Sequence, residues 1–248
     1  MIDRGRGPIR IGVVDSGWTR GSQDERVHRG IGFASRTKRY DIAVDSDDDD
    51  LVGHGTICTR VILALAPNVQ VIPLRVFDRS LETSTRILCA ALEWAVSARF
   101  DLLNLSLSTT TDGARDPLYR LCERLDQQGT IIVAAARNKY HDGYPATFDN
   151  VLGVSTESAA RQGQLAFEPT GSTDYAISRA TPNPAASGRG NASISDSSLA
   201  AAYVAGLAAS TLETRGRMSR FALRALLDGQ LGVTRCSVDT DPAELRHP

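Results

Sequence analysis

The sequence lacks long apolar runs and has no excess of charge of one sign. No uninterrupted apolar stretch reaches the roughly 18 residues that a membrane-spanning helix needs. The chain opens with MIDRGRGP, and the apolar stretch that follows is only about as long as a strand, so we expect no secretory signal. The formal net charge of -1 gives neither the basic field typical of nucleic-acid binding nor the acidic excess typical of disorder. We therefore expect a cytoplasmic protein with no membrane partner and no nucleic-acid partner.

Closely spaced cysteine pairs are also missing. The 4 cysteines lie at positions 58, 89, 122 and 236, so no CxxC motif of a metal or redox site occurs. The first three lie in apolar, helix-like segments, where a free thiol packs as a small hydrophobic group. We expect reduced thiols in a chain without a secretion signal, although the even number also allows disulfides.

The 248 residues are 42% hydrophobic and 23% charged, which suits one large α/β domain or two small ones. No internal repeat and no linker divides the chain, so we interpret residues 1–248 as a single domain. Because the first apolar strand begins soon after Met1, we expect no prodomain.

Apolar strand-like segments alternate with helix-like segments along the chain. β-Branched and apolar runs bounded by turn residues predict strands at 9–14, 69–76, 102–107, 130–136 and 151–154. Helical periodicity predicts helices at 53–66, 84–97, 116–127, 198–212 and 221–227, and residues 183–196 have the composition of a loop. This alternation is typical of βαβ units, so we predict an α/β fold of three layers: a mostly parallel sheet with helices on both faces.

Four polar residues fall where such a sheet presents its strand ends. Asp15 ends the first strand and Asn138 follows the fourth, whereas His54 and Ser198 each begin a helix. Ligands of open parallel sheets bind outside the carboxyl ends of the strands, so we expect these residues to converge there. A serine hydroxyl becomes a nucleophile when a base takes its proton, a buried carboxylate orients that base, and an amide stabilises the oxyanion. Taken singly, each of the four has a structural explanation as a turn, helix-start or N-cap residue.

Several segments, in the same order along the chain, resemble the sequence motifs of the subtilase family. They are VVDSG at 13–17, GHGT at 53–56, LNLSLS at 103–108, VAAARN at 133–138, GYPA at 143–146 with NV at 150–151, and SLAAAYVAG at 198–206. The resemblance implies a subtilisin-like serine endopeptidase acting on a peptide or protein substrate. It implies a triad of Asp15, His54 and Ser198, with Asn138 as the oxyanion-hole residue.

The resemblance also implies a substrate-binding surface, and no cofactor. The substrate is expected to lie as an extended strand beside Ser106, Leu107 and Ser108. The S1 pocket is expected to include Ala136, Arg137 and Gly143, with Gly143 at its floor. No metal site is expected, because the helix after His54 runs directly to the next strand, without the loop that holds calcium in many subtilases.

Two departures from the family pattern leave an alternative open. Asp196 replaces a glycine close to the nucleophile, and Arg137 replaces the glycine usually found before the oxyanion asparagine. Ser197 adjoins Ser198, and the register of the following VAG chooses Ser198. The alternative is a subtilase-like pseudoenzyme that binds peptides without cutting them. A non-peptidase α/β-hydrolase is disfavoured, because no Gly-x-Ser-x-Gly motif occurs and the triad residues follow a different order along the chain.

Two further features lie near His54 in the sequence. Cys58 follows it by one helical turn and should pack beside the imidazole. The acidic run DSDDDD at 45–50 comes just before it. We interpret this run as a solvated loop, with a weak cation site or selection of basic substrate residues as alternatives.

Overall fold

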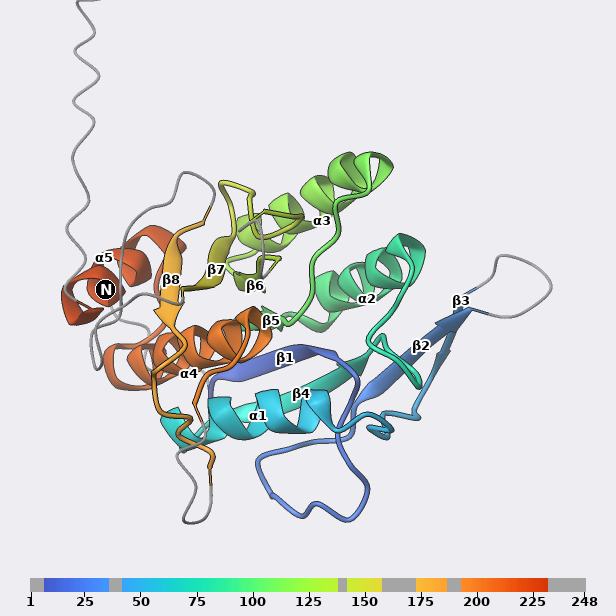
Figure 1. Ribbon diagram of the computed structural model, residues 1–248, viewed down its shortest axis with the longest axis horizontal. Helices are drawn as coiled ribbons and strands as arrows, with labels where there is room; N and C mark the ends of the chain where they lie inside the picture. The colour runs from blue at the N-terminus through green and yellow to red at the C-terminus, as the bar shows by residue number, and fades with distance from the viewer. Residues whose placement is uncertain (1–6, 36–41, 138–141, 158–172, 187–192, 232–248) are drawn as a thin grey trace, which may run out of the picture.

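The computed structural model describes residues 7–35, 42–137, 142–157, 173–186 and 193–231, which are built around one 8-stranded sheet (Figure 1). The order across the sheet is β3-β2-β4-β1-β5-β6-β7-β8. The strands are β1 (Arg10–Asp15), β2 (Ile31–Ser35), β3 (Ile42–Asp45), β4 (Gln70–Arg75), β5 (Leu102–Leu105), β6 (Ile131–Ala135), β7 (Leu152–Glu157) and β8 (Tyr175–Ser178). Neighbouring strands are parallel except β2 and β3, which pair antiparallel.

Helices cover both faces of the sheet, which confirms the three-layer α/β prediction. One face carries α1 (His54–Leu65), α4 (Ser197–Arg215) and α5 (Arg220–Leu231), which share one buried hydrophobic cluster. The opposite face carries α2 (Thr85–Ala98) and α3 (Arg115–Gln127), which share a second cluster; a short 3-10 turn, η1 (Asp112–Ala114), precedes α3. The two clusters arise because successive strand residues point to opposite faces.

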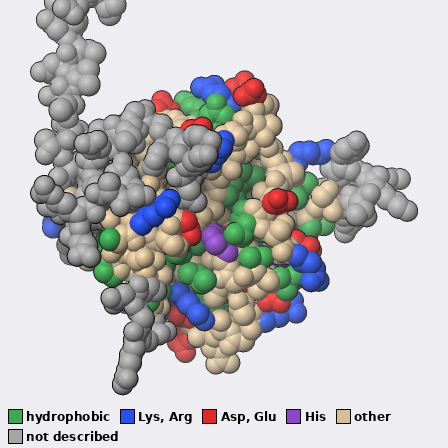
Figure 2. Space-filling view, in the orientation of Figure 1, with side chains coloured by type: hydrophobic (Ala, Val, Ile, Leu, Met, Phe, Trp, Pro, Cys, Tyr) green, Lys and Arg blue, Asp and Glu red, His purple; other side chains and the backbone are tan. Residues whose placement is uncertain are grey.

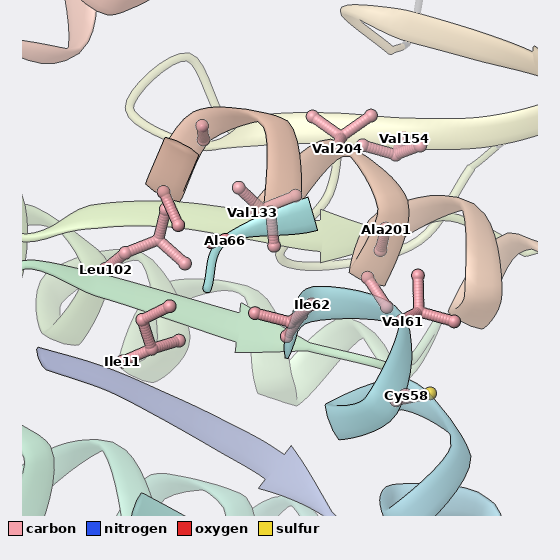
Figure 3. Close-up of a cluster of buried hydrophobic side chains, with 14 of the residues drawn as sticks. Ile11, Cys58, Val61, Ile62, Ala66, Leu102, Val133, Val154, Ala201 and Val204 are labelled. Carbon is pink, nitrogen blue, oxygen red and sulfur yellow. The ribbon is translucent and has the colours of Figure 1, made fainter. Parts of the chain in front are cut away.

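The core beneath α1 and α4 is close-packed because α4 is rich in small residues. Ile11, Leu102 and Val133 project from adjacent strands toward these helices (Figure 3). Gly206 lets α4 approach α1, since a Cβ there would lie 2.8 Å from the Leu65 side chain. The backbone of α1 is therefore held firmly on the sheet, which fixes the direction of its first turn.

Successive strands are added on one side of β1 and then on the other, so β1 lies at a topological switch point of the sheet. From β4, on one side of β1, the chain passes through α2 to β5 on the other side. A crevice forms outside the carboxyl ends of the strands at such a switch point. The ends of β1 and β5 flank this crevice, and α1 and α4 begin beside it.

The expected helices and strands are present, with ends shifted by a few residues, but three strands were missed. These are β2, β3 and the edge strand β8. The described cysteines, at 58, 89 and 122, are free thiols, as expected, and Cys236 lies outside the described residues. Within the described ranges, every helix is too short or too polar to cross a bilayer.

Candidate active site

Asp15 is the last residue of β1 and is completely buried. Its Oδ1 accepts a hydrogen bond from the Ser16 backbone N–H at 2.7 Å. The backbone carbonyl of Asp15 accepts from the Val76 N–H at 2.8 Å. These contacts fix both the chain and the carboxylate at the end of a central strand, so Asp15 presents a rigid acceptor to whatever lies above it.

His54 is the first residue of α1 and lies directly over Asp15. Its Nδ1 is 2.8 Å from Asp15 Oδ1 and 3.0 Å from Oδ2, and because a carboxylate accepts, Nδ1 carries the proton. Two glycines permit this approach. Gly53 caps α1 with a φ of 87, and a Cβ on Gly55 would lie 2.5 Å from the Gly17 carbonyl oxygen. Nε2 is thereby left as the basic nitrogen.

The surroundings of His54 raise its pKa above the ordinary value. Burial is the largest influence and by itself would lower the pKa, because it disfavours the imidazolium. The hydrogen bond and negative charge of Asp15, with the charges of Asp196 and Asp50, outweigh burial. The imidazolium that forms when His54 accepts a proton is therefore stabilised.

Ser198 lies in the first turn of α4, two residues after the N-cap. Asp196 is that cap: its backbone is extended and its Oδ1 accepts from the Leu199 N–H at 3.0 Å. Asp196, which stands where the family has a glycine, therefore acts as an ordinary helix cap. Ser198 Oγ donates to the Ser106 carbonyl oxygen at 3.0 Å. Within the described part of the chain, no hydrogen bond joins Ser198 to His54.

A cleft of about 690 Å³ runs past both residues. Figure 2 shows a histidine near the middle of the face seen in Figure 1, with hydrophobic side chains on either side of it. The lining of the cleft also includes Phe77, residues 81–85 and Leu88, together with residues 106–109 and 135–137. The predicted site residues that line the cleft are His54, Ser198, Ser106, Leu107, Ser108, Ala136 and Arg137.

Besides Asp15, which lies buried beneath His54, two of the predicted residues are not placed on the cleft. Asn138 lies outside the described residues, so its oxyanion role stays a prediction. Gly143 is buried, with a φ of 105, and lies behind Ser108, where a Cβ would come within 3.0 Å of the Ser108 Cβ. In the described part of the structure it does not line the cleft, so its place at the floor of S1 also stays a prediction.

Cys58 packs beside the imidazole, as the helical spacing predicted. Its Sγ is 4.0 Å from His54 Nδ1, and the residue is completely buried. Burial, followed by the charge of Asp15, raises the pKa of the thiol well above its usual value. The Asp15, His54 and Cys58 ligand atoms lie within 4.8 Å of one another, but a protonated thiol and an Nδ1 bonded to Asp15 fit a metal ion poorly.

The acidic run is not the unanchored loop that its composition suggested. Asp48 Oδ2 accepts from the Gly30 N–H at 2.6 Å, and Asp47 and Asp49 both pair with Arg20. Asp50 is buried, and it is the functional candidate that sequence reasoning missed. The described residues 45–50 do not line the cleft.

An aspartate–histidine pair beside a serine at a helix N-terminus is the residue set of a serine hydrolase. Comparison with known proteins then identifies the family. A model of the subtilase family matches residues 6–231, and the chain belongs to that family.

Two curated relatives illustrate the similarity. The chain is 29% identical to "Thermostable alkaline protease" of Halalkalibacterium halodurans over 213 residues, which cover 81% of this chain and 55% of the relative. It is 30% identical to "Minor extracellular protease Epr" of Bacillus subtilis over 176 residues, which cover 66% of this chain and 25% of the relative. The chain thus spans about half of the first relative and a quarter of the second.

Solved structures share the fold. A cold adapted subtilisin-like serine proteinase superposes with a TM-score of 0.68 at 21% identity, covering 90% of this chain and 82% of that structure. The Epidermin Leader Peptide Processing Serine Protease (EpiP) from Staphylococcus aureus gives a TM-score of 0.64 at 17% identity, covering 92% and 69%. These similarities confirm the subtilisin-like fold. The single-domain boundary and the cytoplasmic location stay predictions.

Proposed function

We propose that this chain is a serine endopeptidase that hydrolyses peptide bonds with Asp15, His54 and Ser198. The observation that carries the proposal is the 2.8 Å hydrogen bond between His54 Nδ1 and the buried Asp15 carboxylate, at the edge of a cleft that Ser198 also lines. Membership of the subtilase family supports it.

In the proposed reaction, Ser198 Oγ attacks the scissile carbonyl while His54 Nε2 takes its proton. Asp15 holds the reactive tautomer of the imidazole and stabilises the imidazolium. The tetrahedral oxyanion accepts hydrogen bonds from the Ser198 backbone N–H and the Asn138 amide. His54 then protonates the leaving amine, and the C–N bond breaks to give an acyl-enzyme. Water attacks the ester, His54 takes the water proton, and that proton returns to Ser198 as the acid leaves.

In the proposed mechanism, the Ser198 side chain rotates about χ1 to meet His54. Its hydroxyl donates to the Ser106 carbonyl, and a change of χ1 between staggered wells exchanges that hydrogen bond for one to His54 Nε2. The Ser106–Ser108 segment borders the cleft, where a substrate strand would pair with its backbone.

We test this function by incubating the purified chain with a peptide library and locating the cut sites by mass spectrometry. The proposal expects discrete cuts that are abolished by Ser198→Ala and by His54→Ala, while Ser197→Ala retains activity. Loss of cutting on Ser197→Ala alone would transfer the nucleophile to that residue and refute the assignment.

The second candidate is a peptide-binding pseudoenzyme. The observation that favours it is the Ser198 hydroxyl, which donates to a backbone carbonyl instead of to His54. The same library distinguishes the two functions: the pseudoenzyme retains peptides uncut, and Ser198→Ala then leaves their binding unchanged.

We further propose that the cleft is selective, as suits a maturation protease with few substrates. Arg137 supports this, because its side chain lines the cleft, pairs with Asp142 at 3.7 Å, and donates to Thr110 Oγ1 at 3.2 Å. A guanidinium fixed in this way disfavours Lys or Arg in the adjoining pocket. Arg137→Gly should increase kcat/KM for P1 Lys relative to P1 Leu; an unchanged ratio excludes Arg137 as a specificity residue.

A further inference from the structure

Asp50 is the buried member of the acidic run, and both of its carboxylate oxygens accept hydrogen bonds from nearby N–H and O–H groups. Oδ1 accepts from the backbone N–H groups of Val52 at 3.0 Å and Gly53 at 2.6 Å. Oδ2 accepts from the Thr56 N–H at 2.8 Å and from the Thr56 hydroxyl at 2.6 Å. These donors belong to the first turn of α1 and the residues before it, so Asp50 holds the segment that carries His54.

Burial is the largest influence on the Asp50 carboxyl and raises its pKa, but hydrogen bonds from Thr56, Ser16 and Gly53 outweigh it. The pKa lies below the usual value, so the carboxylate is anionic at neutral pH. Only an acceptor without a proton satisfies this set of donors.

Ser16 connects the first turn of α1, which Asp50 holds, to the strand that carries Asp15. The Ser16 Oγ accepts from the Gly55 N–H at 2.8 Å, and the Ser16 side chain helps to lower the pKa of the Asp50 carboxyl. The Ser16 N–H in turn donates to Asp15 Oδ1 at 2.7 Å. Ser16, the neighbour of Asp15, is therefore hydrogen-bonded to Gly55, the neighbour of His54.

We propose that Asp50 is a positioning residue: with Ser16 and Thr56, it sets the position of the His54 imidazole relative to Asp15. The inference rests on the proposed function, in which His54 is the base. Asp50 positions the imidazole through the backbone of α1, because it bonds to that turn and does not line the cleft; separately, its negative charge favours the imidazolium. Rates depend steeply on such placement, and a misplacement of about 1 Å costs roughly 100-fold.

The chain offers matched variants for the test. Asp50→Asn replaces one acceptor oxygen with a donor, and Ser16→Ala removes the hydroxyl that connects the two segments. Thr56→Val removes the hydroxyl that donates to Asp50 and accepts from the Thr19 N–H, at nearly constant volume, whereas Thr56→Ser retains it. Asp49→Asn is the control, because Asp49 lies in the same run but bonds to Arg20. Ser16→Ala serves as the main variant if Asp50→Asn does not fold.

The first readout is the low-field NMR signal of the His54 Nδ1 proton, which reports the hydrogen bond to Asp15 and needs no turnover. The second is kcat and KM for a cleaved peptide. We expect Ser16→Ala and Asp50→Asn to weaken or shift this signal and to lower kcat by 10-fold to 100-fold at similar KM, by the same placement argument. Thr56→Ser should restore what Thr56→Val loses, and Asp49→Asn should match the wild type.

An unchanged Nδ1 signal in both Ser16→Ala and Asp50→Asn would overturn the positioning role. Losses that fall equally on Thr56→Val and Thr56→Ser would overturn it as well. If the wild type cuts no peptide, the proposed function fails, whereas the NMR signal still decides whether Asp50 positions His54.

Discussion

The side chain of Asp196 combines a helix cap with a charge near His54, and two substitutions separate these effects. Asp196 Oδ1 accepts from the Leu199 N–H at 3.0 Å, and the negative charge of Asp196 contributes to the raised pKa of His54. Asp196→Asn keeps the cap and removes the charge, whereas Asp196→Ala removes both.

The stability effect follows from the cap. Loss of an N-cap costs about 1 kcal/mol, and loss of a carboxylate from the N-terminus of a helix costs about 0.3–1 kcal/mol more. In a chain of this size, 1 kcal/mol corresponds to roughly 2–4 °C in Tm. We therefore expect Asp196→Ala to melt several degrees below the wild type, and Asp196→Asn to lose at most about half as much.

The catalytic effect follows from the charge. His54 must be neutral to accept the Ser198 proton, so activity is lost as the pH falls through its pKa. Both variants remove an anion that favours the imidazolium, so both should lower that pKa and extend activity to more acidic pH. The raised pKa of His54 also increases the free energy of unfolding. This contribution is complete at pH values below the unfolded pKa of about 6.5, and it is lost as the pH rises through the pKa of the folded state. The stability difference between Asp196→Asn and the wild type should therefore be larger at acidic pH.

The assay is kcat/KM from pH 5 to pH 9, with thermal unfolding of the same preparations. If the acidic side of the pH dependence of kcat/KM stays at the wild-type pH in both variants, the charge of Asp196 does not affect the pKa of His54. A wild-type Tm in Asp196→Ala would show that the side chain is not the cap of α4.

Three further predictions concern the same region. Cys58→Ala should retain activity and resist mercurial inhibition that the wild type suffers, because a mercury adduct on Cys58 displaces the imidazole; equal sensitivity in kinetic assays would exclude that site. Gly55→Ala should cost about 1–3 kcal/mol in urea unfolding and most of the activity, because its Cβ would lie 2.5 Å from the Gly17 carbonyl oxygen; a fully active variant would refute this packing. EDTA should leave Tm and activity unchanged, since α1 continues unbroken from His54 to Leu65; a loss that Ca²⁺ reverses would reveal a calcium site.

Much of the fold was predictable because its strands are fully buried and strongly apolar. The missed strands have weaker signals. Strand β2 contains a glycine and pairs with only two residues of β4 (Ile31 and Gly32 with Leu74 and Arg75), whereas β3 is a partly exposed edge strand. Strand β8 is the short segment YAIS, and polar residues precede and follow it, so no longer apolar run marks it in the sequence. Tertiary packing, more than local preference, makes these segments strands.

The candidate site was predictable where a residue ends a strand or begins a helix, as Asp15, His54 and Ser198 do. Asp50 was missed because a run of aspartates suggests a solvated loop, whereas its burial follows from packing against Thr56 and Ser16. A signal was present, since an aspartate shortly before a helix commonly bonds to the free N–H groups of its first turn.

The central claim is that Ser198 is a nucleophile activated by the Asp15–His54 pair. Labelling with a fluorophosphonate probe, followed by peptide mass spectrometry, tests it most directly. The account predicts one adduct per chain, on Ser198, formed at a rate that falls as His54 becomes protonated, and no adduct in Ser198→Ala or His54→Ala. An intact chain that stays unlabelled, or an adduct on another serine, would contradict it.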